Sequence, residues 1–159
     1  MGGGTGHAAR RRRRRDLRAG RGLAAARPVA WRYLVERGGT AVALADTVER
    51  PRDVEGGGGH VLAQVNYGPF VSGIARALAA AERADEAAEV EPRVLHVPAL
   101  RLVAVWLHQL GGEDRLVPAE PSPEGIEANV ARPAGELLAQ LAERARAVPE
   151  RAPDDQLGG

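Results

Sequence analysis

Six consecutive arginines, Arg10 to Arg15, stand in a Gly/Ala-rich segment near the start of the chain. Residues 1–28 carry nine arginines against one acidic residue, a net charge of +8, whereas the rest carries 13 arginines against 20 acidic residues, a net charge of −7. A block of like charges repels itself and is typical of an unfolded tail. We therefore predict a disordered Arg/Gly/Ala-rich leader over residues 1–28, a single domain over residues 29–149 and a flexible tail over residues 150–159.

The basic residues also bear on the origin of the leader. All 22 of them are arginine, and Ala, Gly, Pro and Val are abundant, a pattern that follows the codon composition of a GC-rich genome and predicts a high-GC bacterium as the source. Three interpretations of the leader stay open: a misassigned start codon, an inert solubilising tail, and contact with nucleic-acid phosphates. The phosphate contacts would come from Arg10, Arg11, Arg12, Arg13, Arg14 and Arg15. No aromatic residue precedes Trp31, so base stacking is not expected and any such binding would be non-specific.

Because the leader is predicted to lie outside the folded domain, deleting it should leave the thermal midpoint nearly unchanged.

Composition limits the compartment and the class of protein. The chain has no cysteine, which excludes disulfides, thiolate metal ligands and a thiol nucleophile and favours a reducing cytoplasm. Asp16 and Arg18 interrupt the first segment, which therefore lacks the apolar stretch of a secretory signal. No stretch approaches the roughly 20 apolar residues of a membrane span. We expect a cytoplasmic protein without a membrane span.

The first part of the domain has the pattern of a β-hairpin. Large apolar residues alternate with other residues over 31–36, the pair Gly38-Gly39 follows, and residues 40–48 continue as a second strand. A two-residue turn would place Trp31 opposite Asp46. The packed face of this hairpin is predicted to carry Trp31, Tyr33 and Val35.

The order of the remaining segments indicates the fold class. Further strands are predicted over residues 60–65, 93–97, 100–108 and 115–117, with a main helix over residues 69–88 and a last helix that ends near Val148. Strands and helices do not alternate as in βαβ units, so we predict an α+β fold. It would be an antiparallel sheet of five to six strands with one main helix and a C-terminal helix on one face. This is also the arrangement of cystatin-like folds, an analogy that carries no function.

The titratable residues show no known catalytic or metal-binding spacing. His96 and His108 form neither a His-x₃-His pair nor a His-Glu-x-x-His motif, and neither Ser72 nor Ser122 lies in Gly-x-Ser-x-Gly. We predict no catalytic residue, no cofactor and no metal ligand. Two histidines and one acid stay as weak pocket candidates, namely His96, His108 and Asp46.

Asp46 has two open interpretations. The predicted hairpin register places it beside Trp31 on the packed face, where burial would raise its pKa. Alternatively, it lies at the open end of the hairpin.

Four segments resemble a small uncharacterised α+β family of high-GC actinobacteria. They are Val61–Phe70, Arg93–Leu100, Trp106-Leu107-His108 and Gly135–Leu138. The resemblance spans residues 31–148 and leaves the arginine run outside. Since that family has no assigned activity, the resemblance implies a coherent fold and a bacterial host, and it transfers no functional residue.

Two functional hypotheses follow. The first is a non-enzymatic cytoplasmic binding or accessory module that engages an unknown protein or small ligand through a sheet face or a Pro-rich loop. The alternative is a non-specific nucleic-acid-associated protein that acts through the arginine run. An enzyme with a carboxylate–histidine site ranks third. The sequence leaves the oligomeric state open.

Overall fold

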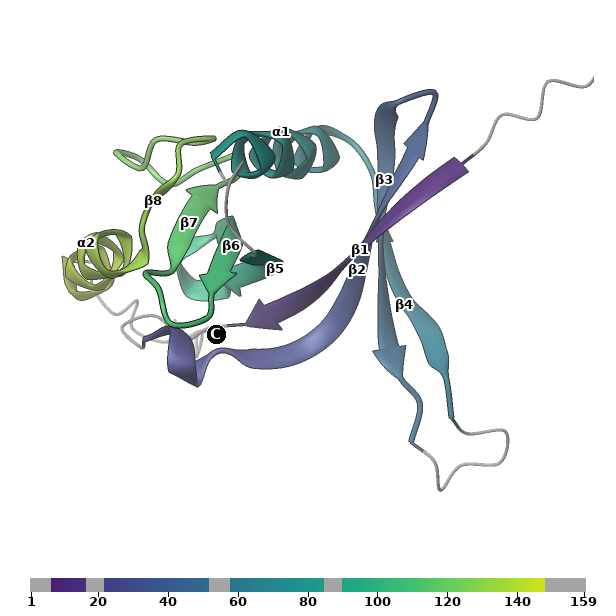
Figure 1. Cartoon of the computed structure of the whole chain (residues 1–159), viewed down its shortest axis with the longest axis horizontal. Helices are drawn as coiled ribbons and strands as arrows, with labels where there is room; N and C mark the ends of the chain where they lie inside the picture. Colours follow the sequence, from purple (N-terminus) through teal and green to yellow (C-terminus); the bar gives the residue numbers. More distant parts are fainter. Residues whose placement is uncertain (1–6, 17–21, 52–57, 85–89, 148–159) are drawn as a thin grey trace, which may run out of the picture.

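The computed structural model describes residues 7–16, 22–51, 58–84 and 90–147, which form a mixed sheet of eight strands and two α-helices (Figure 1). The fold is therefore α+β, in agreement with the prediction. The strands are β1 (His7–Asp16), β2 (Arg27–Arg37), β3 (Thr40–Glu49), β4 (His60–Asn66), β5 (Val90–Val97), β6 (Leu102–Gln109), β7 (Arg115–Pro118) and β8 (Arg132–Pro133). The α-helices are α1 (Pro69–Ala84) and α2 (Ala134–Ala147), and the 3₁₀ helices are η1 (Leu23–Ala25) and η2 (Pro98–Leu100).

The sheet has the strand order β4-β3-β2-β1-β5-β6-β7-β8. Neighbouring strands are antiparallel except for β1 and β5, which are parallel. The prediction of five to six antiparallel strands is therefore wrong in two respects. It omitted β1 and the two-residue β8, and it did not foresee a parallel pair in the centre of the sheet.

The arginine run is the central strand of this sheet. β1 pairs along its whole length with β2, and its last four residues, Arg13–Asp16, pair with Arg93–His96 of β5. The prediction of a disordered leader is thus wrong for residues 7–16 and 22–28, whereas the predicted tail over residues 150–159 lies outside the described residues. A strand sends successive side chains to opposite faces, which separates neighbouring charges, and the aliphatic stems of arginine pack well against apolar surface.

The predicted β2–β3 hairpin is confirmed at its turn. Arg37 pairs with Thr40 across Gly38 and Gly39, whose φ angles of 54° and 77° match a type I′ turn. Further from the turn, a β-bulge shifts the register between Glu36 and Val35. The bulge adds one residue to β3, which changes the partner of every β2 residue from Val35 back to Trp31.

Because of the bulge, Trp31 faces Thr47 and not Asp46, while Arg32 faces Asp46. Leu34 and Arg32 are buried on the side of α1. Trp31, Tyr33 and Val35 therefore project from the opposite face, since side chains alternate along a strand. The predicted packed face of the hairpin is therefore wrong, because Arg32 and Leu34 face α1.

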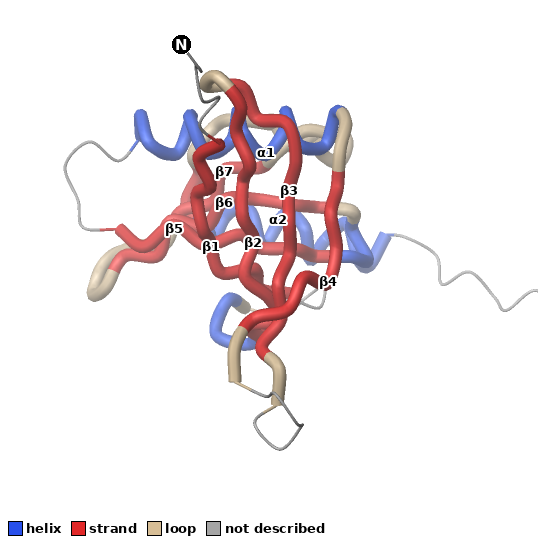
Figure 2. Tube along the Cα trace, turned by 90° about the vertical axis from the view of Figure 1, so that its right-hand side faces the viewer, coloured by secondary structure: helices blue, strands red, loops and turns tan. Residues whose placement is uncertain are grey.

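The sheet curls strongly, so that β1 to β4 stand as one layer and β5 to β7 run across behind them (Figure 2). α1 packs inside this curl against the concave face and contacts β3, β6 and β7. α2 covers the other face of β5 to β7, where Leu137 and Leu141 meet Leu95, Trp106 and Leu116. The helices thus lie on opposite faces, contrary to the prediction. The physical reason is β6, in which all of Leu102–Leu107 is buried, as expected for a strand covered on both sides.

None of the described helices is both long enough and apolar enough to cross a lipid bilayer.

Candidate functional site

A row of polar side chains crosses the concave face of the sheet. Arg12, Arg32, Asp46 and Gln64 lie directly opposite one another on β1, β2, β3 and β4. Directly opposed residues share a face, so this row points to the side that α1 covers. Elsewhere on this face the core is apolar, as expected beneath a helix.

Asp46 and Arg32 form the centre of the row. Nε of Arg32 donates to Oδ1 of Asp46 over 2.7 Å, and a terminal guanidinium nitrogen donates to Oδ2 over 2.8 Å. The Arg32 side chain is only 6% exposed and the Asp46 side chain only 2%. This two-point geometry is the strongest form of the arginine–carboxylate interaction.

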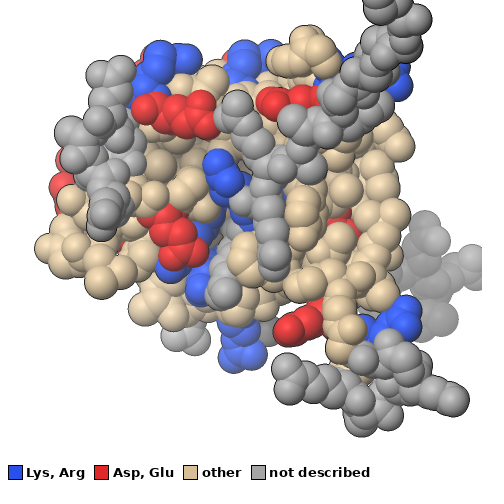
Figure 3. Space-filling view, turned by 45° about the vertical axis from the view of Figure 1, so that its right-hand side comes forward, with Lys and Arg blue, Asp and Glu red and all other residues tan. Residues whose placement is uncertain are grey.

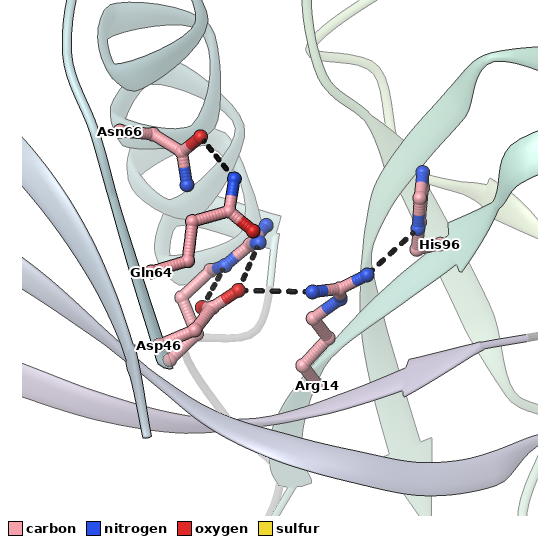
Figure 4. A network of polar contacts seen from close by, with 6 residues as sticks. Arg14, Asp46, Gln64, Asn66 and His96 are labelled. Carbon is pink, nitrogen blue, oxygen red and sulfur yellow. Dashed lines mark hydrogen bonds and ion pairs between the residues drawn. The ribbon is translucent and has the colours of Figure 1, made fainter. Parts of the chain in front are cut away.

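Arg14 extends the pair to a fourth strand. One of its terminal nitrogens donates to Oδ2 of Asp46 over 2.9 Å, and the other lies 3.2 Å from Nδ1 of His96 on β5 (Figure 4). Because arginine nitrogens only donate, Nδ1 of His96 accepts this hydrogen bond and the ring proton lies on Nε2. We call Arg32, Asp46, Arg14 and His96 the polar chain; it connects β2, β3, β1 and β5.

The polar chain sets the charge state of Asp46. Burial by itself raises the pKa of the carboxyl, but hydrogen bonds and charge from Arg32, together with those from Arg14, outweigh burial and hold the pKa below its ordinary value of 3.8. The predicted rise in pKa is wrong because the bulge places an arginine opposite Asp46 in place of Trp31. Asp46 is therefore ionised at neutral pH.

A cavity of about 230 Å³ lies among α1, β1, β5 and β6, on the concave face that also carries the polar chain. It is lined by Arg12, Leu78, Ala81, Glu82, Val90, Pro92 and Leu107. Arg12 and Arg14 are two residues apart on one strand, which places them on the same face about 7 Å apart. Figure 3 shows basic side chains running down the middle of one face of the molecule, with acidic side chains around them.

Arg15 belongs to the opposite face. Its guanidinium lies 5.7 Å from the ring centroid of Trp106 and donates to the backbone oxygen of Ala26 over 3.1 Å. Arg93 lies over the same ring at 4.9 Å. Arginine stacked on an indole contributes a cation–π attraction as well as packing. Arg12, Arg14 and Arg15 are thus integrated into the fold, whereas the side chains of Arg10, Arg11 and Arg13 lie outside the described part.

His108 does not join the other candidates. It pairs with Glu91 at one end of the β5–β6 ladder, whereas His96 pairs with Val103 near the other end. Nδ1 of His108 lies 3.0 Å from Oδ1 of Asp114, in the loop between β6 and β7. The structure therefore brings Asp46 and His96 together through Arg14 and assigns His108 to a loop contact. Within the described residues, no group of three or more acidic or histidine side chains is arranged to hold a metal ion.

Sequence reasoning proposed Arg12 and Arg14 for nucleic-acid contact only and did not single out Arg32. A lone arginine among the apolar residues of β2 was the available signal, but the bulge that aligns it with Asp46 has no clear sequence marker.

Comparisons with known protein families, with curated proteins and with solved structures found no match. The actinobacterial family and the cystatin-like arrangement accordingly stay predictions.

Proposed function

We propose that this protein is a non-enzymatic binding module for a small anionic molecule, whose apolar part occupies the cavity beside α1 and whose anionic group contacts Arg12 and Arg14. The observation that carries this proposal is the cavity itself, because apolar side chains line it together with one arginine, Arg12. An apolar pocket with a few convergent polar groups is the usual form of a small-molecule site.

The charges on this face support an anionic ligand. Arg14 and Arg32 both bind Asp46, the one carboxylate of the row, and Arg12 lies opposite Arg32, while Glu82 adds a second carboxylate to the cavity lining. Both oxygens of Asp46 already accept hydrogen bonds from Arg32. The Arg14 side chain keeps 19% of its surface exposed, so solvent reaches it. A guanidinium suits a carboxylate or a phosphate because its donors match the spacing of two oxygens.

The cavity lining favours binding over catalysis. Serine, threonine and histidine are missing from the described residues that line it, so they form no hydroxyl nucleophile with a histidine base there. Its volume is below the roughly 300 Å³ at which pockets for drug-sized molecules begin, which favours a compact ligand. A cytoplasmic location is part of the proposal and rests on the cysteine-free composition.

The direct test is calorimetric titration of the full chain with hexanoate, benzoate and phenyl phosphate, each compared with a neutral analogue such as hexanamide. We expect binding of an anion and weaker binding of its neutral analogue. Arg12→Gln should weaken anion binding about tenfold or more, since a hydrogen bond to a charged group contributes roughly 1.5–3 kcal/mol. Arg37→Gln, at the exposed end of β2, is the matched control and should change nothing.

Equal binding of the anion and its neutral analogue, or an Arg12→Gln protein that binds as well as the wild type, would contradict the proposal. Titration with a single-stranded oligonucleotide at low and high salt tests the nucleic-acid alternative. Steeply salt-dependent binding of the oligonucleotide without binding of the small anions would favour that alternative.

A further inference from the structure

β4 forms one edge of the sheet, at the end of the molecule opposite α2 (Figure 1). None of the described strands pairs with its outer side. An edge strand presents a row of backbone donors and acceptors to any chain that can align with it, and native proteins commonly protect such edges with charge or proline.

The sequence of β4 lacks this protection. No Asp, Glu, Lys or Arg occurs from His60 to Ala75, and no proline occurs from His60 to Gly68. Two copies of β4 can therefore lie side by side without opposing like charges. Large apolar side chains are also exposed here, with Leu62 64%, Val65 37% and Tyr67 73% exposed.

A bulge places two of these side chains on one face. Leu62 pairs with Thr47 and Val65 pairs with Ala45, with one extra residue, Ala63, between the two pairs. Thr47 and Ala45 in turn face Trp31 and Tyr33 on β2. Residues three apart on a regular strand point to opposite faces, so the bulge is what brings Leu62 and Val65 to the same, convex face.

The exposed apolar side chains of β4 are complementary to those of a second β4 strand. If two β4 strands run antiparallel about a two-fold axis between Ala63 and Gln64, Leu62 of each copy lies opposite Val65 of the other copy. The same register places His60 of each copy opposite Tyr67 of the other. Directly opposed apolar side chains on one face stabilise a strand pair. All three exposed apolar side chains thereby obtain a partner.

We infer that the protein forms a symmetric dimer through antiparallel pairing of β4 with β4 of a second copy, which joins the two sheets into one. The partner is a second copy because a single register places a side chain of the other copy opposite each of Leu62, Val65 and Tyr67. A single pair of short strands is a small interface, so the dimer should assemble reversibly as concentration rises. This inference does not depend on the concave-face site.

Sedimentation velocity of the full chain tests the dimer. Over a rising concentration series, the wild type should shift from one chain of 16.8 kDa toward twice that mass. Leu62→Lys places a charge opposite Val65 of the other copy and should keep the protein monomeric across the series. Leu110→Lys is the matched control, since Leu110 is 89% exposed beyond the end of β6 and should leave the shift intact. A wild type that stays monomeric throughout, or a Leu62→Lys protein that still dimerises, overturns the inference.

Cysteine cross-linking tests the register, because the chain contains no cysteine of its own. Leu62→Cys and Val65→Cys proteins are mixed and oxidised, and the disulfide-linked species are identified by mass. The proposed register predicts mainly the mixed dimer, in which position 62 of one copy is linked to position 65 of the other. A preponderance of 62–62 or 65–65 links refutes this register.

Discussion

At the scale of single residues, Asp46 is the position on which the polar chain depends. Its carboxylate accepts hydrogen bonds from both Arg32 and Arg14, so Asp46→Asn removes the negative charge that two guanidinium groups share. Arg32 would then be a buried charge without compensation from Asp46. We expect a loss of about 3–5 kcal/mol in the free energy of unfolding, measured by urea titration. Glu113→Gln, an exposed acid in the β6–β7 loop, should stay within about 0.5 kcal/mol of the wild type.

The lowered pKa of Asp46 gives this loss a defined pH dependence. The folded state binds a proton at Asp46 less readily than the unfolded chain, whose carboxyl titrates near 3.8. The stabilisation is therefore complete above 3.8 and is lost as pH falls through the lower folded-state pKa. Urea titrations at several pH values should give a constant difference between wild type and Asp46→Asn over about pH 5 to 7 and a smaller one in acid. A difference that stays the same at the lowest pH where both proteins fold would contradict this assignment.

Sequence reasoning reached some of these residues and missed their arrangement for a physical reason. Asp46 and His96 were selected as titratable groups next to apolar strands, and the structure does connect them. The connecting residue, Arg14, was assigned to a tail because six arginines in a row resemble an unfolded segment more than a strand. Whether an arginine packs depends on the strand beside it, and Arg14 lies between Ala30 of β2 and Val94 of β5.

At the scale of secondary-structure elements, α1 approaches its neighbours closely at one glycine. A Cβ atom added to Gly73 would overlap the backbone oxygen of Glu120, in the segment that follows β7. The backbone there cannot yield as a flexible side chain would. We therefore expect Gly73→Ala to destabilise the protein by about 1–3 kcal/mol in thermal or urea unfolding, although alanine is the better helix former.

Gly135 in α2 provides the comparison, because a Cβ atom added there meets nothing within 4 Å. Gly135→Ala should leave stability unchanged or raise it slightly. If both substitutions behaved alike, the close contact between α1 and the segment after β7 would be refuted.

Some helices and strands were predicted from the sequence, and others were not. The apolar periodicity of α1 and the continuous apolar run of β6 are local signals, and both elements lie close to their predicted positions. The helix that covers each face of β6 was not predicted, because a continuous apolar run does not show which helix lies on which side. β1 and β8 carry little apolar pattern, so only their partner strands define them as strands.

At the scale of the whole molecule, β1 holds the two halves of the sheet together. It is the only described strand that links β2 to β5, and the polar chain crosses at the same place. A chain that begins at Pro28 should therefore lose its cooperative thermal transition, as followed by circular dichroism. This outcome is the reverse of the small effect that the sequence predicts for deletion of a leader.

The comparison protein begins at His7 and keeps every residue of β1. Cooperative unfolding of that chain together with its loss in the shorter one would assign the effect to residues 7–27. Equal melting of the two chains would show that β1 contributes nothing to the stability of the sheet.

The parallel pairing of β1 with β5 also governs the order of folding. β2, β3 and β4 are neighbours in sequence and can assemble by local hairpin formation, whereas Arg14 meets Val94 only after most of the chain has been made. Closing so long a loop costs chain entropy before any contact repays it, and such closures slow folding. During synthesis on the ribosome, β1 therefore has one unpaired edge until β5 has been made, and the arginines that later bind Asp46 and stack on Trp106 keep that edge charged and soluble.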